Sequence, residues 1–204
     1  MKGIIRSAVT GLALAIGCGA CCGLGEAKRT VTVAEKTGAA IQRAIDEVAA
    51  AGGGRVVVPA GEYPSGSLRM RSHVELHLEK GATVVGGDRS EDYFSFPVSV
   101  CAVRPEGSAR VFVYAWDAED IAITGEGAFE GQGPKFFDHS TLKGNARFWA
   151  KPACERPRMV QFVKCRGIRL KGVTFKDSPG WTMLIRLCEN IEVDGIRVVA
   201  DQRI

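Results

Sequence analysis

Residues 165–175 and 188–198 carry the same pattern of hydrophobic and polar positions. In the first copy Ile168 and Leu170 alternate with charged residues, and Ile191 and Val193 do the same 23 residues later. A period of two is typical of a β-strand with one buried and one solvated face. A glycine ends each strand, and a second short alternating segment follows at residues 173–175 and 196–198. Each repeat therefore predicts two strands joined at a bend.

The repeat extends toward the N-terminus. Residues 120–125 align with the first copy at a distance of 47 residues, about two periods, so that Ile121 matches Ile168. Residues 74–81 form another alternating strand that ends in glycine. A coil of this kind buries its hydrophobic edge only by stacking on the next coil. The pattern predicts an all-β fold, a right-handed single-stranded parallel β-helix, or solenoid.

A short helix is expected to cap the first coil. Thr37 is a favourable N-cap residue, and hydrophobic residues follow at helical spacing until residues 52–54, a run of three glycines, end the pattern. The hydrophobic stripe consists of Ile41, Ala44, Ile45, Val48 and Ala49. A helix laid across the open end of a solenoid protects both its core and its strand edges.

Residues 1–27 are predicted to be an export signal, and residues 28–204 one β-helix domain. Lys2 and Arg6 precede a largely hydrophobic segment, and residues 25–27 offer a small-x-small cleavage site before Lys28. A lipoprotein signal acylated at Cys18 is the alternative. Either route predicts an exported protein that is secreted, periplasmic or at the cell surface, and no internal segment is long enough to span a membrane.

Composition and charge limit the kinds of molecule that the chain is expected to bind. The formal net charge of +4 is spread over both signs, which does not favour nucleic acid or a membrane surface. No metal-ligand spacing is present, so no cofactor and no metal are expected, and a complete protein of this kind is expected to be a monomer.

Cys101, Cys154, Cys165 and Cys188 follow the signal. Cys165 and Cys188 occupy equivalent positions of adjacent coils, where either a disulfide or a ladder of stacked thiols fits; parallel side chains favour the ladder.

Two longer excursions interrupt the coils, at residues 88–105 and 134–154. The first carries Tyr93, Phe94 and Phe96 close together. These aromatic rings either stack on a sugar or fix the loop to the solenoid wall, and the second interpretation is the more general one.

Several segments resemble a known family. Residues 39–46 and 52–63 resemble the first coil of the pectin-lyase-like β-helix superfamily. Residues 127–133, 156–162, 177–182 and 187–191 resemble the polygalacturonases of glycoside hydrolase family 28. The resemblance covers nearly all of residues 28–204. It implies inverting hydrolysis, without a metal, of the α-1,4-linked galacturonic acid chains of pectin.

The same resemblance places the catalytic carboxylates in Asn-Thr-Asp and Asp-Asp motifs, followed by Gly-His-Gly and Arg-Ile-Lys. None of these occurs in residues 1–204. We therefore expect the chain to correspond to the N-terminal half of such an enzyme and to be inactive alone, with no catalytic residue of its own.

Asp177 and Trp181 are the candidate substrate-binding residues. Asp177 and Asp201 lie 24 residues apart at equivalent corners, but solvated turn carboxylates explain them better than an acid and base pair, which requires a set separation. Trp181 could face a sugar or pack into its corner. His73, His77 and His139 show no partner pattern.

Two other functions fit the fold. A polysaccharide lyase would usually need a calcium site of clustered acidic residues, and no such cluster stands out. A carbohydrate-binding or adhesive β-helix module needs no catalytic motif at all, and the sequence is compatible with it.

Overall fold

The computed structural model describes residues 29–97, 109–141 and 150–200. The predicted export signal with Cys18, and also Cys101 and Asp201, lie outside these ranges. No helix among the described residues has the length and hydrophobicity needed to cross a membrane.

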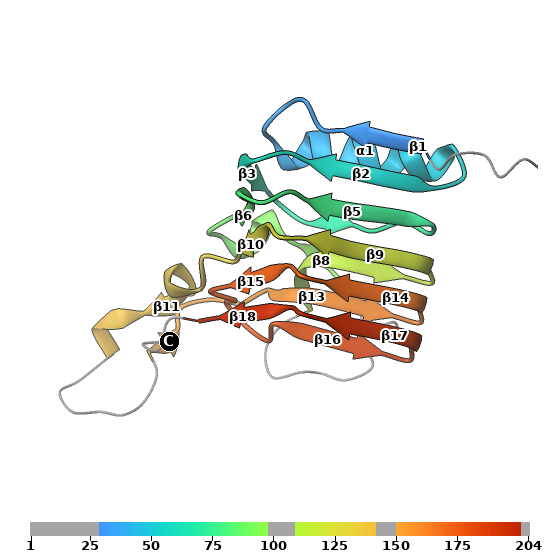
Figure 1. The fold of residues 1–204 in the computed structure, drawn as a ribbon. Coiled ribbons are helices and arrows are strands. Elements are labelled where there is room, and N and C mark those ends of the chain that lie inside the picture. Colours follow the sequence, from blue (N-terminus) through green and yellow to red (C-terminus); the bar gives the residue numbers. More distant parts are fainter. Residues whose placement is uncertain (1–28, 98–108, 142–149, 201–204) are drawn as a thin grey trace, which may run out of the picture.

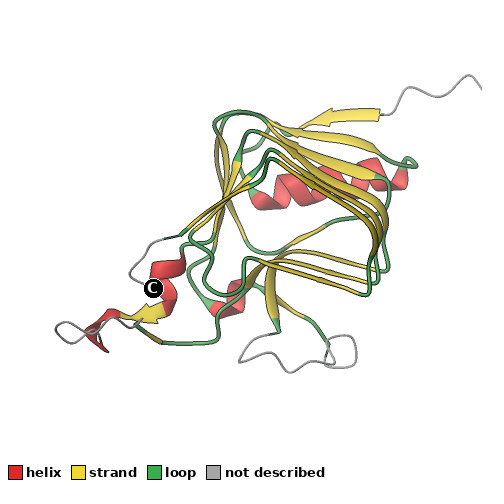
Figure 2. Ribbon diagram, turned by 60° about the horizontal axis from the view of Figure 1, so that its bottom comes forward, coloured by secondary structure: helices red, strands yellow, loops and turns green. Residues whose placement is uncertain are grey.

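The chain forms a right-handed parallel β-helix whose coils stack along one axis (Figure 1). Each coil has three sides, and equivalent sides form three sheets (Figure 2). Sheet A consists of β1 (Arg29–Thr32), β2 (Gly54–Val58), β5 (Val74–Leu78), β9 (Glu119–Gly125), β14 (Arg166–Lys171) and β17 (Glu189–Asp194). Sheet B consists of β3 (Gly61–Ser65), β6 (Ala82–Gly86), β10 (Ala128–Glu130), β15 (Thr174–Lys176) and β18 (Arg197–Val199).

Sheet C forms the third side. Its parallel strands are β4 (Leu68–Arg69), β8 (Arg110–Trp116), β13 (Arg158–Val163) and β16 (Met183–Arg186), and β7 (Phe94–Ser95) pairs antiparallel with β8. The remaining elements are the strand pair β11 (Phe137–Asp138) and β12 (Lys151–Pro152) and the 3₁₀ helices η1 (Ser90–Asp92), η2 (Gly133–Phe136) and η3 (His139–Thr141).

The predicted register is confirmed. Ile168 of β14 pairs with Ile121 of β9 on one side and with Ile191 of β17 on the other. The 47 residues between Ile121 and Ile168 were expected to span about two periods, but they make one coil, because a long connection lies between β10 and β13. The prediction of two strands per repeat was wrong, because each full coil has a third strand in sheet C. All six residues of β13 are buried. Its two faces are therefore both covered, and the alternation that reveals a half-solvated strand is absent.

The corners of the coils differ in length. Two residues separate β8 from β9, β13 from β14 and β16 from β17, and two separate each following sheet A strand from its sheet B strand. The corners from sheet C to sheet A use left-handed backbone at equivalent positions, for example Asp117, Lys164 and Leu187. The corner from sheet B to sheet C is variable instead: the chain runs from Gly86 to Arg110, from Glu130 to Arg158, and from Lys176 to Met183.

The predicted cap is helix α1, Gly38–Ala50, which packs beside β1 and β2 at one end of the stack (Figure 1). The hydroxyl of Thr37 accepts a hydrogen bond from the amide of Ala40 at 3.2 Å. Ile41, Ile45 and Val48 are completely buried. The helix therefore covers the hydrophobic end of the first coil, as the sequence predicts.

The opposite end of the described structure is uncovered. Ile191 and Val193 of β17 are 45% and 47% exposed, whereas their partners Ile168 and Leu170 in β14 are buried. The same inward-facing position is therefore buried or exposed according to whether another coil stacks on it.

Cys165 and Cys188 are free thiols stacked in neighbouring coils, which agrees with the ladder interpretation. The amide of Cys165 donates to Cys188 Sγ at 3.3 Å. Burial raises the pKa of the Cys165 thiol to about 11. Such a thiol is protonated and a poor nucleophile at neutral pH.

The aromatic residues of the first excursion fix it to the solenoid wall. Tyr93 and Phe96 are buried. Phe94 stacks on Tyr114 of sheet C with ring centroids 4.4 Å apart. The structure therefore supports the interpretation in which these rings fix the loop to the solenoid wall, and not the one in which they stack on a sugar.

Candidate functional site

The outer face of sheet B presents a regular array of polar side chains. Tyr63, Val84, Phe129 and Phe175 pair in register and point into the core, where all four are buried. Because side chains alternate along a strand, the residues on either side of these four point outward. One outward row contains Pro64, Val85, Glu130 and Lys176, and the other contains Glu62, Thr83, Ala128 and Thr174.

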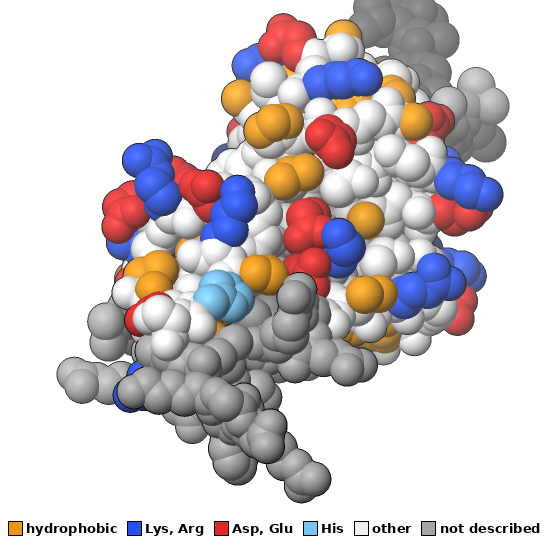
Figure 3. All heavy atoms as spheres, turned by 90° about the vertical axis from the view of Figure 1, so that its left-hand side faces the viewer, with side chains coloured by type: hydrophobic (Ala, Val, Ile, Leu, Met, Phe, Trp, Pro, Cys, Tyr) orange, Lys and Arg blue, Asp and Glu red, His pale blue; other side chains and the backbone are white. Residues whose placement is uncertain are grey.

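A groove follows this face where its strands end (Figure 3). One hollow of about 550 Å³ is lined by Glu62, Thr83, Val85, Ala128, Glu130, Gln132, Pro134, Lys135, Lys176 and Asp177. A neighbouring hollow of about 470 Å³ is lined by Pro64, Ser65, Gly66, Val85, Gly86, Gly87, Asp88, Asp92 and Gln132.

The two hollows share Val85 and Gln132, and we call them together the sheet B groove. The groove crosses β3, β6, β10 and β15, a distance of about 14 Å at the usual spacing between strands. An open groove of this length suits an extended polymer.

Lys176 is held by two carboxylates at one end of the groove. Its Nζ lies 2.7 Å from Glu130 Oε2 and 3.8 Å from Asp177 Oδ2. The hydrogen bond and charge of Glu130 raise the pKa of Lys176 above its usual value. The Glu130 side chain is only 15% exposed. Lys176 is therefore a half-exposed cation whose charge is already matched by carboxylates.

These two carboxylates are poorly arranged for inverting hydrolysis. Because both oxygens contact the same ammonium group, their separation is at most the sum of the two distances, 6.5 Å. Inverting glycosidases hold their carboxyl groups about 6.5–9.5 Å apart with a water between them. Here a lysine occupies that place, so Glu130 and Asp177 are suited to accept hydrogen bonds from hydroxyl groups and not to act as acid and base.

Gln132 and Lys135, from the connection that follows β10, complete the groove. Gln132 has a left-handed backbone, and its carboxamide donates to the carbonyl of Gly86. Lys135 Nζ lies 3.2 Å from Asp88 Oδ2, and both side chains are about half exposed. This ion pair joins η2 to the turn after β6.

The structure brings one of the two predicted binding residues to the groove. Asp177 has a left-handed backbone; its amide donates to the carbonyl of Val199 at 2.8 Å, and its carbonyl accepts from the amide of Gly133 at 2.7 Å. Strand β18 and the η2 segment therefore fix its position. It lines the groove, although its carboxylate contacts Lys176 and is not a free acid.

Trp181 lies apart from the residues that line the groove. Its ring is 52% exposed, and the guanidinium group of Arg158 lies 5.4 Å from the ring centre. Arg158 is itself buried and donates to Gln161 Oε1 at 2.8 Å. Trp181 is thus partly packed at its corner, with one face in contact with a cation.

Sequence reasoning did not identify Glu130, Lys135 or Lys176. The strand register gave no signal for the contact between Asp88 and Lys135, because the preceding strands β6 and β10 pair at an offset of 45 residues, Val85 with Glu130, whereas Asp88 and Lys135 are 47 residues apart. Among the described residues, no group of three or more histidine, cysteine or acidic side chains could hold a metal ion.

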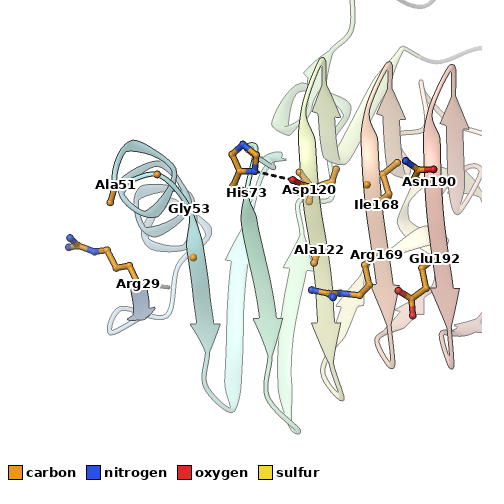
Figure 4. Close-up of a pocket in the computed structure, with 14 residues that line it drawn as sticks. Arg29, Ala51, Gly53, His73, Asp120, Ala122, Ile168, Arg169, Asn190 and Glu192 are labelled. Carbon is orange, nitrogen blue, oxygen red and sulfur yellow. Dashed lines mark ion pairs between the residues drawn. The ribbon is translucent and has the colours of Figure 1, made fainter. Parts of the chain in front are cut away.

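A larger hollow, of about 950 Å³, lies against sheet A (Figure 4). Its floor includes Ala122, and Arg169 extends from β14 toward that alanine. His73 Nδ1 lies 3.3 Å from Asp120 Oδ2 at its edge, but both side chains are more than half exposed. Its other lining includes the glycines at residues 52–54, and none of its residues combines burial with a shifted pKa, so we do not assign it a chemical role.

The same face carries a hydrogen-bond chain. Glu75 Oε1 accepts from Arg55 Nη2 at 2.9 Å and from the Thr124 hydroxyl at 2.7 Å. Because that hydroxyl donates to Glu75, His77 Nδ1, 2.8 Å away, donates to the Thr124 oxygen. The Arg55 hydrogen bond is the main cause that lowers the pKa of Glu75 to about 2, so the network is charged and structural.

Comparison with known proteins places this fold in a family. The model of Glycosyl hydrolases family 28 matches residues 52–203. The chain belongs to glycosyl hydrolases family 28. Family 28 was the family that the sequence motifs resembled, and the match spans nearly the whole described β-helix.

The curated relatives that the chain matches are longer than this chain. An exo-poly-alpha-D-galacturonosidase of Dickeya chrysanthemi is 35% identical over 107 residues, which cover 47% of this chain and 17% of that protein. A polygalacturonase of Ralstonia solanacearum is 25% identical over 173 residues, which cover 78% of this chain and 32% of that protein. The chain thus spans a third or less of the length of these two relatives.

Solved structures share the fold. The hyperthermoactive exopolygalacturonase of Thermotoga maritima matches with a TM-score of 0.65 and 27% identity, over 83% of this chain and 46% of that chain. PfbA, a surface adhesin of Streptococcus pneumoniae, matches with a TM-score of 0.57 and 23% identity, over 83% of this chain and 39% of that chain. The second likeness shows the fold alone.

Proposed function

We propose that this chain forms the N-terminal part of a polygalacturonase-like hydrolase that cleaves pectin-type polysaccharide with inversion, and that it supplies part of the substrate groove. The observation that carries the proposal is the family 28 match across residues 52–203, which coincides with the described β-helix. The chain itself is proposed to contribute binding and not catalysis, with its binding residues in the sheet B groove.

The groove supports a saccharide ligand in three ways. It is open and elongated across four strands, as a polymer requires. It offers carboxylate acceptors in Glu130 and Asp177 for sugar hydroxyl groups. Its floor includes the small or apolar residues Val85 and Ala128, which a sugar ring can approach closely.

Two measurements on the purified chain test the proposal. Electrophoresis in gels containing pectin should retard the chain, whereas gels containing a neutral β-1,4-glucan should not. A reducing-end assay on polygalacturonate should show no release above the buffer control. Equal retardation in both gels would remove the substrate class, and clear release of reducing ends would show that catalytic residues lie within this chain.

The proposed protein is exported and monomeric. The predicted signal at residues 1–27 supports export, and mass spectrometry of the N-terminus in the producing cell tests it. A mature chain that begins at Lys28 would indicate a cleaved signal, and a diacylated Cys18 would indicate a lipid anchor. An intact Met1 in the exported fraction would contradict both.

A carbohydrate-binding or adhesive module is the alternative that needs no catalytic motif. The likeness to the pneumococcal adhesin concerns the fold and does not favour adhesion over hydrolysis. We therefore retain the hydrolase as the proposed function.

A further inference from the structure

Strand β17 forms the free edge of sheet A at the uncovered end of the described structure. It pairs with β14 on one side, and the strand order of sheet A ends with it among the described residues. All six of its residues are exposed, including Ile191 and Val193, which occupy positions that are buried in the preceding coil. Because an edge strand presents unpaired N–H and C=O groups, another strand can add to it.

Ion pairs between neighbouring coils cross the outer face of sheet A. Each pair joins two residues that lie directly in register on adjacent strands. The pairs are Arg55–Glu75 at 2.9 Å, Glu119–Arg166 at 2.8 Å and Lys171–Asp194 at 3.1 Å. On this face, a charged side chain is thus matched by an opposite charge at the same position of the adjacent strand.

Glu189 and Glu192 of β17 stand outside these pairs. Their neighbours in register on β14 are Arg166 and Arg169. Arg166 is already paired with the preceding coil, and Arg169 extends toward Ala122, which also belongs to that coil (Figure 4). Within the described ranges, neither glutamate forms an ion pair of its own. The free edge therefore offers two carboxylates that would be matched by cations on a strand added beyond β17.

We infer that β17 is a docking site for an extended polypeptide segment in which hydrophobic residues alternate with lysine or arginine. The segment adds parallel to β17 as a further strand. Its hydrophobic residues cover Ile191 and Val193, and its cations face Glu189 and Glu192. In this mode of recognition, backbone hydrogen bonds supply affinity and the alternating side chains supply specificity. The inference concerns sheet A and does not depend on the proposed hydrolase function.

A second copy of this chain fits the edge poorly. The outward side chains of β17 include Glu189, Glu192 and Asp194, so pairing between two copies of β17 would bring carboxylates together. Like charges opposite each other destabilise a strand pair. The other end of the stack is covered by α1, so it offers no open coil to β17. The charge pattern therefore favours a basic partner over a copy of the chain.

The chain provides a matched pair of probe peptides. Residues 166–175 contain the strand that pairs with β17 in the structure and carry cations on its outer face, whereas residues 189–198 have the same hydrophobic pattern with acids there. Labelled forms of both peptides are titrated with the full chain and followed by fluorescence anisotropy. The 166–175 peptide should bind at least about tenfold more tightly, and its affinity should fall as the salt concentration rises.

A charge exchange tests the register of the added strand. Glu192→Lys in the chain should weaken binding of the 166–175 peptide about fivefold, because an attraction becomes a repulsion. A peptide carrying Arg169→Glu should lose about as much with the unmodified chain and should regain affinity with the Glu192→Lys chain. Glu91→Lys makes the same change of charge at an exposed residue of η1, on an earlier coil, and should leave the affinity within about twofold.

Hydrogen exchange locates the bound peptide. Residues 189–194 should become protected when the 166–175 peptide binds, and residues 29–32, at the other edge of sheet A, should not. Protection of residues 29–32 in their place would overturn the inference. So would equal affinity for the two peptides, equal losses in Glu192→Lys and Glu91→Lys, or failure of the 166–175 peptide to bind. Dimers of the chain in sedimentation velocity, with residues 189–194 protected in the dimer, would identify a second copy as the occupant and would also refute the inference.

Discussion

Glu75 provides a direct test of the electrostatic reasoning. Its carboxylate accepts hydrogen bonds from Arg55 and Thr124, and its pKa is lowered from the usual 4.5 to about 2. This difference corresponds to about 3 kcal/mol between the two protonation states. Because the side chain is still 21% exposed, solvent screening reduces the effect, and we expect about 2 kcal/mol at pH 7.

The pH dependence follows from the direction of this shift. A carboxylate whose pKa is lower in the folded state stabilises the fold fully above its unfolded pKa, here about 4.5. The contribution is lost as the pH falls toward 2. At pH 3 the unfolded chain is mostly protonated at this position while the folded chain is not, and less than about half of the stabilisation remains.

Urea unfolding of the chain and of Glu75→Gln at pH 7 and pH 3 measures this effect. The variant should be less stable by about 2 kcal/mol at pH 7 and by about 1 kcal/mol or less at pH 3. Asp194→Asn, at an exposed ion pair, should change stability by less than about 0.5 kcal/mol at both values. A cost of Glu75→Gln that is the same at both pH values would refute the assigned charge network.

Three further variants test the packing and the backbone, each by urea unfolding. Phe175→Ala should destabilise the fold by about 3–5 kcal/mol because the ring is fully buried. Val198→Ala, at the 54% exposed neighbouring position in β18, should cost less than about 1 kcal/mol. Equal costs of the two substitutions would contradict the described stacking of the coils. Thr37→Ala should cost about 1 kcal/mol by removing the helix cap, and Thr37→Ser should restore it. Gly125→Ala should destabilise by more than about 1 kcal/mol, because the backbone φ is +106° and the added Cβ would lie 2.0 Å from the carbonyl oxygen of Leu78; a neutral effect would contradict the described corner.

The repeat made most of the fold predictable. Strands β14 and β17 alternate cleanly because one face of each contacts water, and the spacing of 23 residues then fixed which positions stack. Helix α1 was predictable for the same reason, from a stripe on one face. Strand β13 was not, because its six buried residues remove the alternation on which the prediction depends.

The groove was only partly predictable. Asp177 was identified because it follows a predicted strand at a corner, and the structure places it in the groove. Lys135 and Asp88 lie in the excursions, where no strand pattern indicates which residues meet. Their contact depends on how two long segments fold back over sheet B, and periodicity within strands carries no information about that.

Because the corners of the coil differ in length, insertions and deletions have different effects at different corners. At two corners the connections from β2 onward stay short, two to four residues, so there is little room for an insertion before the next strand. At the third corner, connections of very different length leave the register of the sheets intact. Asp88, Gln132, Lys135 and Asp177 all come from this third corner. Insertions and deletions can therefore remodel the groove without disturbing the stack, so the scaffold can evolve slowly while ligand preference changes quickly.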